Sequence, residues 1–251
     1  MIEINHLSKK YSKSNFYAVS DLSLTVNDGE IFGFLGPNGA GKSTTIKCLT
    51  GILPFTEGTI SVCGDNIKDD PIRAKKHIAY VADEHNLYEH LTGAQYVNFI
   101  ADVFAVPERE RKERTEKYAS LFEMTNKIND KISSYSHGMK QKISIIAGLV
   151  HDPDVWVLDE PLTGLDPKSS YQVKQLMHDF AAQGKTVFFS SHVLDVVEKI
   201  CTKVAIIDKG RLVTVCNMDE LQERKNNMDL ETLFLQLTDA LGGDYGTLDK
   251  I

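Results

Sequence analysis

Residues 36–43 read GPNGAGKS, a full match to the pattern G-x-x-x-x-G-K-[ST], and this octapeptide limits the possible folds more than any other stretch. It follows the apolar run IFGFL (31–35) and precedes TTIKCLTG, so we expect a buried strand before it and a helix after it. Gly36, Gly39 and Gly41 allow the backbone to form a nest of N–H groups, and the helix dipole adds positive potential. The sequence therefore predicts a phosphate-binding loop in an α/β protein.

Two groups in this loop and two in a later strand have the chemistry that a metal-bound triphosphate requires. Lys42 can reach the β- and γ-phosphates, and the Ser43 hydroxyl can ligate Mg²⁺. VWVLDEP (155–161) predicts a buried strand that ends in Asp159 and Glu160, at the sheet edge where the loop also opens. Because adjacent strand residues point to opposite sides, we assign Asp159 to the Mg²⁺ shell and Glu160 to the attacking water. A kinase, a GTPase and a transport ATPase remain alternatives.

The other strand patterns predict an α/β fold with antiparallel strands near the N-terminus. Ile2 and Ile4 alternate with polar residues, as do Leu22, Leu24 and Val26. Further strands are expected at TISVC (59–63), HIAYVA (77–82), VWVLD (155–159), TVFFS (186–190) and VAIID (204–208), the last joined by a turn to RLVTV (211–215).

Between about residues 88 and 150, helical periodicity replaces the strand patterns and predicts a helical lobe inserted into the core. One stripe is expected at Tyr96, Val97, Phe99, Ile100 and Phe104, and another at Leu121, Phe122 and Met124. We expect the main domain to span 1–225. A C-terminal segment, 226–251, should contain the rest of an amphipathic helix that begins near 218, and a mobile tail with GGDYGTLDK (242–250).

Composition limits the ligands and the location. The net charge is −7 and the basic residues are scattered, which disfavours nucleic acid as the main ligand. The longest apolar run, ISIIAGLV (143–150), is far shorter than the roughly 20 residues needed to cross a bilayer. We therefore expect a cytoplasmic protein whose membrane role, if any, depends on a partner. The cysteines show no C-x-x-C spacing, so reduced thiols are favoured over a zinc site or disulfides; they are Cys48, Cys63, Cys201 and Cys216.

Three more stretches complete the pattern. SSYSHGMKQK (133–142) leads into an apolar helix, TGLD (163–166) closely follows VWVLDEP, and SSH (190–192) ends a predicted strand. In this order, together with the phosphate loop, they resemble the ATP-binding cassette (ABC) ATPases over about residues 1–225. The resemblance implies a P-loop NTPase core, with a RecA-like mixed sheet, an N-terminal antiparallel region and an inserted α-helical subdomain. It also favours a transport ATPase over a kinase.

The resemblance assigns roles to single residues. The ATP-binding loop would comprise Gly36, Pro37, Asn38, Gly39, Ala40, Gly41, Lys42, Ser43 and Thr44. Tyr11 matches the aromatic residue that stacks on adenine. His192 matches the histidine that contacts the γ-phosphate, and it would be catalytic together with Glu160 and Lys42. Asp166 matches the aspartate that signals across a dimer interface.

YSHGM (135–139) matches the signature loop of the family. Ser136 and Gly138 are retained, whereas His137 and Met139 stand where Gly and Gln are common. Taken alone, Ser136 is expected only to cap its own helix. The resemblance implies instead that two subunits dock head to tail, and that residues 136–139 of one subunit grip the ATP of the other. A second ABC subunit, identical or different, is therefore an expected partner.

Asp83 stands where the family usually has a glutamine, and the resemblance gives it a place near Mg²⁺. Acidic versions of this loop and a YSxGM signature resemble bacterial export cassettes encoded separately from their membrane subunit. We therefore expect an ATPase subunit bound to the cytoplasmic face of the membrane through a permease. Residues 85–91, with Tyr88, Tyr96 and Phe99, are the expected docking surface. A soluble ABC-type ATPase without a membrane partner and a small-molecule kinase remain alternatives.

Overall fold

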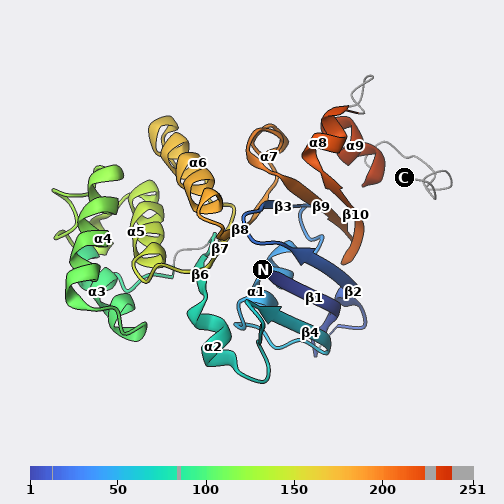
Figure 1. Ribbon diagram of the computed structural model, residues 1–251, viewed down its shortest axis with the longest axis horizontal. Helices are drawn as coiled ribbons and strands as arrows, with labels where there is room; N and C mark the ends of the chain where they lie inside the picture. Colours follow the sequence, from blue (N-terminus) through green and yellow to red (C-terminus); the bar gives the residue numbers. More distant parts are fainter. Residues whose placement is uncertain (13, 84–85, 224–229, 239–251) are drawn as a thin grey trace.

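A six-stranded sheet lies at the centre of the computed structural model, which describes residues 1–12, 14–83, 86–223 and 230–238 (Figure 1). Its strands are β3 (Ile31–Leu35), β6 (Ile78–Val81), β7 (Val155–Asp159), β8 (Thr186–Ser191), β9 (Lys203–Asp208) and β10 (Arg211–Asn217). Their order is β10-β9-β3-β8-β7-β6; β10 runs antiparallel to β9, and the other neighbouring pairs are parallel. Every residue of β3, β7 and β8 is buried, which is typical of parallel strands covered on both faces.

The strands predicted at 77–82, 155–159, 186–190 and 204–208 all belong to this sheet. The predicted turn between β9 and β10 is also present. Lys209 (φ 47°) and Gly210 (φ 77°) both adopt the left-handed conformation, which suits the twist of a two-residue hairpin loop.

A second, four-stranded antiparallel sheet packs against the first. It contains β1 (Ile2–Lys10), β2 (Tyr17–Val26), β4 (Glu57–Val62) and β5 (Asp65–Asn66), in the order β2-β1-β4-β5. Residues 22–26 of β2 alternate between buried and exposed, as predicted. Buried residues of both sheets share one hydrophobic cluster, in which the rings of Phe32 and Phe188 stack with centroids 5.5 Å apart. The predicted N-terminal antiparallel region is thus confirmed.

In the described part of the segment between β6 and β7, three α-helices form a lobe at one end of the molecule (Figure 1): α3 (Gly93–Val103), α4 (Glu108–Leu121) and α5 (His137–Leu149), with a short 3-10 helix (Ile132–Ser134) before α5. A capping box begins α3, because the Thr92 side chain accepts a hydrogen bond from the backbone N–H of Gln95, and the Gln95 side chain accepts one from the N–H of Thr92. Val97 is buried in one cluster with residues of α5, whereas Phe99 is 43% exposed. The predicted apolar stripe is therefore wrong at Phe99, which lies about 200° around the helix from Val97.

The remaining helices are α1 (Lys42–Leu49), α2 (Pro71–Lys76), α6 (Pro167–Ala182), α7 (Leu194–Ile200), α8 (Met218–Glu223) and α9 (Leu230–Leu237). The helical prediction from residue 218 is confirmed by α8 and α9, and the predicted tail at 242–250 lies outside the described residues. Among the described helices, none combines the length and the apolar character needed to cross a membrane.

His151, just after α5, gives the fold a pH dependence. Its ring stacks on Phe104 with centroids 3.7 Å apart, both ring nitrogens are buried, and burial lowers the pKa of His151 to about 4. The unfolded chain, with an ordinary histidine pKa near 6.5, therefore binds a proton more readily than the folded protein. The contribution of this histidine to stability is complete above pH 6.5 and is lost as the pH falls toward 4.

We expect the unfolding free energy to fall by up to about 3 kcal/mol between pH 6.5 and pH 4 because of His151. In His151→Phe this component of the pH dependence should disappear, because a phenyl ring can stack on Phe104 but cannot titrate. Urea unfolding at pH 7 and pH 4.5 measures the difference. The exposed His178, changed to Phe in the same way, should keep the wild-type dependence. Equal pH dependence in wild type and His151→Phe would contradict the prediction.

Candidate nucleotide-binding and catalytic site

Four neighbouring strands of the central sheet end at one edge, and the predicted binding and catalytic residues lie at these ends. The phosphate loop follows β3, and His192 follows β8. Asp159 is the last residue of β7 and Glu160 comes directly after it, while Asp83 lies two residues beyond β6. In α/β proteins the crevice at the carboxyl ends of parallel strands is the usual ligand site, so the sheet topology alone collects these groups.

A cavity of about 240 Å³ lies at this edge. Its lining residues are Ala18, Asn38, Gly39, Gly41, Lys42, Ser43, Thr44, Asp83, Asp159 and Glu160. The structure thus brings most of the predicted phosphate-binding and metal-binding residues together, and adds Ala18, which the sequence did not indicate. Five of the residues predicted to bind ATP or to be catalytic lie outside this lining: Tyr11, Gly36, Pro37, Ala40 and His192. The predicted signature residues 136–139 and Asp166 lie outside it as well.

The phosphate loop has the backbone conformation that its glycines were expected to permit. Gly39 (φ 82°) and Gly41 (φ 109°) adopt positive φ angles, and α1 begins directly after Gly41. A Cβ atom on Gly41 would lie 2.6 Å from the carbonyl oxygen of Ala18 in β2, and one on Gly36 would lie 2.4 Å from that of Ile207 in β9. The loop is therefore enclosed by backbone on two sides and cannot accept side chains at these glycines.

Gly41→Ala should accordingly weaken ATP binding at least about tenfold, equivalent to about 1.4 kcal/mol, because the loop must move to relieve the contact with Ala18. Strained backbone of this kind also costs about 1–3 kcal/mol of folding free energy. Isothermal titration with ATP and urea unfolding measure the two effects. Gly184→Ala is the control, since Gly184 has φ 77° but no atom within 4 Å of an added Cβ. It should lose stability and keep ATP affinity; wild-type ATP affinity in Gly41→Ala would refute the argument.

Lys42 is buried, with 8% of its surface exposed, and its Nζ donates hydrogen bonds to the carbonyl oxygens of Gly36 (2.7 Å) and Pro37 (3.3 Å). Burial lowers the pKa of Lys42, while the charges of Glu160 and Asp159 act in the opposite direction.

The donor groups of the cavity fit a magnesium ion. Three carboxylates, from Asp83, Asp159 and Glu160, line the cavity with the hydroxyl-bearing Ser43 and one ammonium group. Carboxylate, hydroxyl and phosphate oxygens are the ligands that Mg²⁺ prefers. Because the carboxylates outnumber the single lysine, a divalent cation bound here would reduce their repulsion of a polyanion.

Asp159 and Glu160 differ in environment, although not for the reason predicted. The strand ends at Asp159, and Glu160 adopts a left-handed conformation (φ 49°), so the expectation that both lie on one strand was wrong. Asp159 is buried and accepts a hydrogen bond from the Ser190 hydroxyl (2.6 Å), which also accepts one from the backbone N–H of Glu160 (3.2 Å). Ser190, which lies in SSH (190–192) but had no predicted role, therefore fixes both acidic residues. Its position opposite Asp159 in the β7–β8 register is the signal that could have revealed it.

His192 contacts Glu160. The Nδ1 atom of His192 lies 2.9 Å from Oε2 of Glu160, and the two side chains are 62% and 16% exposed. Glu160 is thus held within the site, while the histidine ring remains open to solvent.

Tyr11 lies beside the phosphate loop. Its hydroxyl lies within hydrogen-bonding distance of Thr44 Oγ1 (3.3 Å), and the side chain is 42% exposed. Lys9 Nζ lies 5.2 Å from the ring centroid. The Tyr11 ring is therefore an exposed aromatic surface, and its hydroxyl contacts the first turn of α1.

The loop at 135–139 begins α5 and does not line the cavity of its own chain. Ser136 is the N-cap, and its hydroxyl accepts a hydrogen bond from the backbone N–H of Met139 (3.3 Å). A Cβ added to Gly164 would lie 2.1 Å from Cδ2 of His137, so the imidazole lies directly over that glycine. Because Gly164 (φ 74°) has no side chain, there is room for the imidazole of His137. This histidine stands at the signature position where glycine is common.

Two residues beyond the predicted loop join α5 to the segment after Glu160. The fully buried Gln141 donates a hydrogen bond from Nε2 to the carbonyl oxygen of Pro161 (2.8 Å). Lys142 Nζ lies 3.1 Å from Asp166 Oδ2, and hydrogen bonds from Ser169, together with Lys142, lower the pKa of Asp166. Asp166 is the N-cap of α6, and its contacts within this chain are with α5 and α6; its predicted role at a dimer interface stays a prediction.

Gln141→Leu should destabilise the protein by about 1–3 kcal/mol, because the Pro161 carbonyl would lose its partner in a buried position. Gln183→Leu is a matched control, since Gln183 also donates from Nε2 to a backbone carbonyl, that of Asp179 (2.9 Å), but on the surface. It should change the unfolding free energy by less than about 0.5 kcal/mol. Urea unfolding compares the two, and equal effects would show that the Gln141 bond is not structurally important.

Comparison with known proteins identifies the family. A family model described as "ABC transporter" matches residues 19–163, more than half of the chain. The chain belongs to the ABC transporter family. The linearmycin resistance ATP-binding protein LnrL of Bacillus subtilis is 34% identical over 224 residues, which cover 89% of this chain and 71% of LnrL.

Solved structures agree with this assignment. The structure of an ATP-binding subunit of an ABC transporter is 29% identical, has a TM-score of 0.89, and is matched over 94% of this chain and 99% of its own. A dimeric ATP-binding cassette in a post-hydrolysis state, bound to ADP and Pi, shares the fold at 23% identity with a TM-score of 0.80, over 87% of this chain and 99% of its own. The chain is therefore an ABC ATPase, the ATP-binding subunit of an ABC transporter, and the predicted fold is confirmed. ABC ATPases function as dimers with transmembrane components.

Proposed function

We propose that this ABC ATPase hydrolyses Mg²⁺-bound ATP in a closed dimer and that the reaction powers export through a permease. The observation that carries the proposal is the contact between Glu160 and His192 beside the cavity lined by Lys42 and Ser43. A phosphate loop, an acidic metal-binding group and a carboxylate paired with a histidine together suit the attack of water on a phosphate.

Lys42 and the N–H groups of the phosphate loop would bind the phosphates, and Tyr11, exposed beside that loop, would stack on adenine. Ser43 and Asp159 would hold Mg²⁺, with Asp83 at the edge of the same cavity. The ion would neutralise charge on the phosphate oxygens during transfer.

Glu160 would accept a hydrogen bond from the attacking water and take its proton. Two contacts support this role, because the Ser190 hydroxyl fixes the Glu160 backbone and His192 fixes one oxygen of its carboxylate. The other carboxylate oxygen can then face the water. His192 is exposed enough for its second ring nitrogen to reach the terminal phosphate.

The signature loop would act on the ATP of a second subunit. Ser136 and His137 are exposed at the N-terminus of α5 and do not line the cavity of their own chain. Helix N-termini attract phosphate, so a second copy, or a different cassette, placed head to tail could use this one. Gly138 and Met139 would complete the contact, and Asp166, close to α5 through Lys142, would transmit closure between the sites. A solved cassette of the same fold is a dimer bound to ADP and Pi, which agrees with a dimer of this chain.

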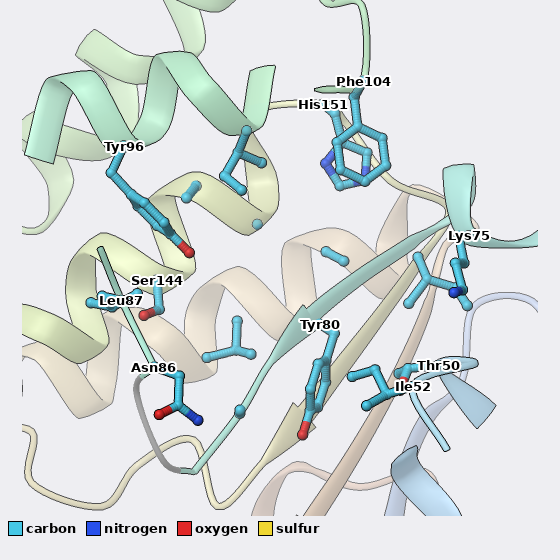
Figure 2. A pocket seen from close by; sticks show the side chains of 17 residues that line it. Thr50, Ile52, Lys75, Tyr80, Asn86, Leu87, Tyr96, Phe104, Ser144 and His151 are labelled. Carbon is cyan, nitrogen blue, oxygen red and sulfur yellow. The ribbon is translucent and has the colours of Figure 1, made fainter. Parts of the chain in front are cut away.

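A groove between the helical lobe and the core would receive the permease. A cavity of about 440 Å³ has Tyr96 and Ser144 of the lobe on one side and Tyr80 of β6 on the other (Figure 2). Tyr88 and Phe99, predicted for this surface, lie outside its lining but contact each other edge to face, with centroids 5.5 Å apart, and both are exposed. His85, also predicted, lies outside the described residues.

Export is supported by the acidic residue at Asp83 and by the YSxGM-type signature, which resemble those of export cassettes. The related LnrL is named for resistance to linearmycin, which agrees with removal of a compound from the cell. In this proposal the chain is held at the cytoplasmic face of the membrane by its permease.

Purification from detergent-solubilised membranes tests this function. The chain should co-purify with a multi-spanning membrane protein in a fixed ratio, and Ser144→Arg, which fills the groove, should abolish the association. Ser120→Arg, the same change on an exposed part of α4, should not. Recovery of the chain without a membrane protein would favour a soluble ABC-type ATPase instead.

A further inference from the structure

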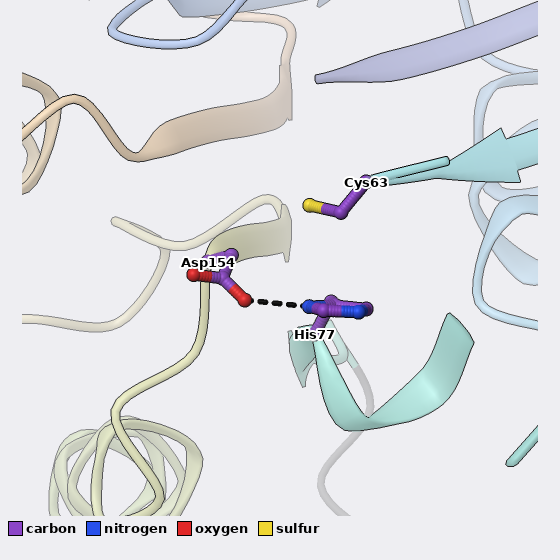
Figure 3. Close-up of side chains that lie close together, drawn as sticks. All are labelled: Cys63, His77 and Asp154. Carbon is purple, nitrogen blue, oxygen red and sulfur yellow. Dashed lines mark hydrogen bonds and ion pairs between the residues drawn. The ribbon is translucent and has the colours of Figure 1, made fainter. Parts of the chain in front are cut away.

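A cluster of three side chains lies at the end of β7 opposite the nucleotide site (Figure 3). Cys63 belongs to the turn after β4, His77 ends α2, and Asp154 immediately precedes β7. Each residue offers one ligand atom, and the three atoms lie within 4.8 Å of one another. We propose that Cys63, His77 and Asp154 bind a zinc ion.

The backbone holds these residues in place independently of their side chains. The N–H groups of Asp154 and Val155 both donate hydrogen bonds to the carbonyl oxygen of His77 (3.0 and 2.9 Å). The carbonyl oxygen of Asp154 accepts one from the N–H of Thr186 (2.9 Å). Cys63 has a left-handed conformation (φ 51°), which turns the chain between β4 and β5. The three donors are therefore preorganised by both sheets, as a metal site requires.

The imidazole of His77 lies between two carboxylates. Its Nδ1 is 2.6 Å from Asp154 Oδ2, and its Nε2 is 3.2 Å from Asp65 Oδ2. A neutral ring carries a single N–H and can donate to only one of them. When Nε2 donates to Asp65, the lone pair of Nδ1 faces the Asp154 carboxylate, and either a second proton or a metal ion between the two atoms makes this contact favourable.

A metal ion suits that position better than a second proton because of the third group. A proton shared by His77 and Asp154 would need no third ligand. A metal ion would, and the Cys63 sulfur lies within 4.8 Å of both donor atoms (Figure 3). The outer contacts also match a metal centre. Asp65 Oδ2 can accept a hydrogen bond from His77 Nε2, and Asp65 Oδ1 is 3.1 Å from Arg73 Nη2. A carboxylate in this position commonly orients a metal-binding histidine.

The combination of thiolate, imidazole and carboxylate selects zinc among common cellular cations. One thiolate and one carboxylate balance the charge of Zn²⁺, and water can take the fourth position. Zinc bonds of about 2.0–2.3 Å place tetrahedral ligand atoms roughly 3.3–3.7 Å apart. His77 Nδ1 and Asp154 Oδ2 would therefore separate by about 1 Å as the ion binds, and the sulfur would move inward.

The ion would connect the two sheets. Cys63 extends from the four-stranded sheet, while His77 and Asp154 flank β6 and β7 of the central sheet. The absence of C-x-x-C spacing favoured reduced thiols over a zinc site. This site uses a single cysteine, with ligands far apart in the sequence, and so has no short motif.

Metal titration of the full chain, after treatment with a chelator, tests the proposal. Calorimetry should give one Zn²⁺ per chain at this site, and Co²⁺ should produce the near-ultraviolet charge-transfer band of a cobalt–thiolate bond. Cys63→Ser should abolish the band and weaken zinc binding more than about 100-fold, whereas Asp65→Asn should keep the band and weaken binding about 10–100-fold. Cys216→Ser, which removes a cysteine outside the proposed site, should match wild type.

Unfolding measurements provide a second readout. Zn²⁺ should raise the Tm of the wild type and not that of Cys63→Ser, and the metal-free forms should have similar Tm values because Cys63 is exposed. Absence of the charge-transfer band in the wild type would overturn the proposal. So would equal zinc affinity in wild type and Cys63→Ser, which would assign the ion to the oxygen donors of the nucleotide cavity.

Discussion

Glu160→Gln is expected to lower the kcat for ATP hydrolysis by about 10²–10⁴-fold and to leave the Kd for ATP nearly unchanged. Glutamine keeps the size of the side chain and a hydrogen bond to water but cannot take the proton. Lys42, Ser43 and Asp159, which the proposal assigns to phosphates and metal, are not altered. Because ATP would stay intact between the subunits, the variant should accumulate as a dimer when ATP is saturating. Phosphate release, equilibrium ATP binding and size-exclusion chromatography measure the three effects.

Glu108→Gln is the matched control, because Glu108 is an exposed glutamate in the first turn of α4, in the helical lobe. It should hydrolyse ATP at the wild-type rate and dimerise no more than wild type. If Glu160→Gln kept its turnover, another group would have to be the base. If it lost turnover but remained a monomer with saturating ATP, Glu160 would still be catalytic and the closed dimer would be wrong.

Ser136→Arg should lower kcat by at least about 10²-fold, comparable to the loss of one donor to a transition-state oxygen. The arginine would occupy the space at the exposed N-terminus of α5 and prevent close approach to a phosphate on the other subunit. The ATP-binding residues of the same chain are untouched, so the Kd for ATP of the monomer should not change. Phosphate release and ATP titration separate these quantities.

Two further variants distinguish the proposed contact of Ser136 with a phosphate on the other subunit from its role as the N-cap of α5. Ser133→Arg places the same side chain on an exposed residue just before the loop and should remain active. Ser136→Ala removes the hydrogen bond to the Met139 N–H and should cost about 1 kcal/mol of stability. Loss of ATP affinity in monomeric Ser136→Arg would contradict the prediction, since it would place the loop at the site of its own chain.

Much of the fold was predictable because the chain has strong local patterns. The fully buried strands β3 and β7 and the alternating strand β2 have distinct sequence patterns that the structure follows. The site could be anticipated for the same reason. Its groups lie at the ends of those strands, so recognising each strand also located Asp159 and His192.

The remaining features depend on contacts between distant segments. The left-handed conformation of Glu160 and its bond to Ser190 arise because β8 lies beside β7, which no local pattern contains. The bond from Gln141 to Pro161 likewise joins residues of different elements. Phe99 was placed in one stripe with Val97 because hydrophobicity alone does not say which face of a helix is covered. Its exposed ring next to Tyr88 is visible only in the folded lobe.

Mixed dimers test most directly whether each active site is shared by two subunits. Lys42→Ala chains lack the phosphate-binding lysine, and Ser136→Arg chains lack the signature contact, so each variant alone should be inactive. A heterodimer would hold one intact site, made from the Lys42 of one chain and the Ser136 of the other. Mixing the two inactive proteins should restore ATP hydrolysis in proportion to the fraction of heterodimers. A mixture that forms heterodimers and stays inactive would contradict this prediction.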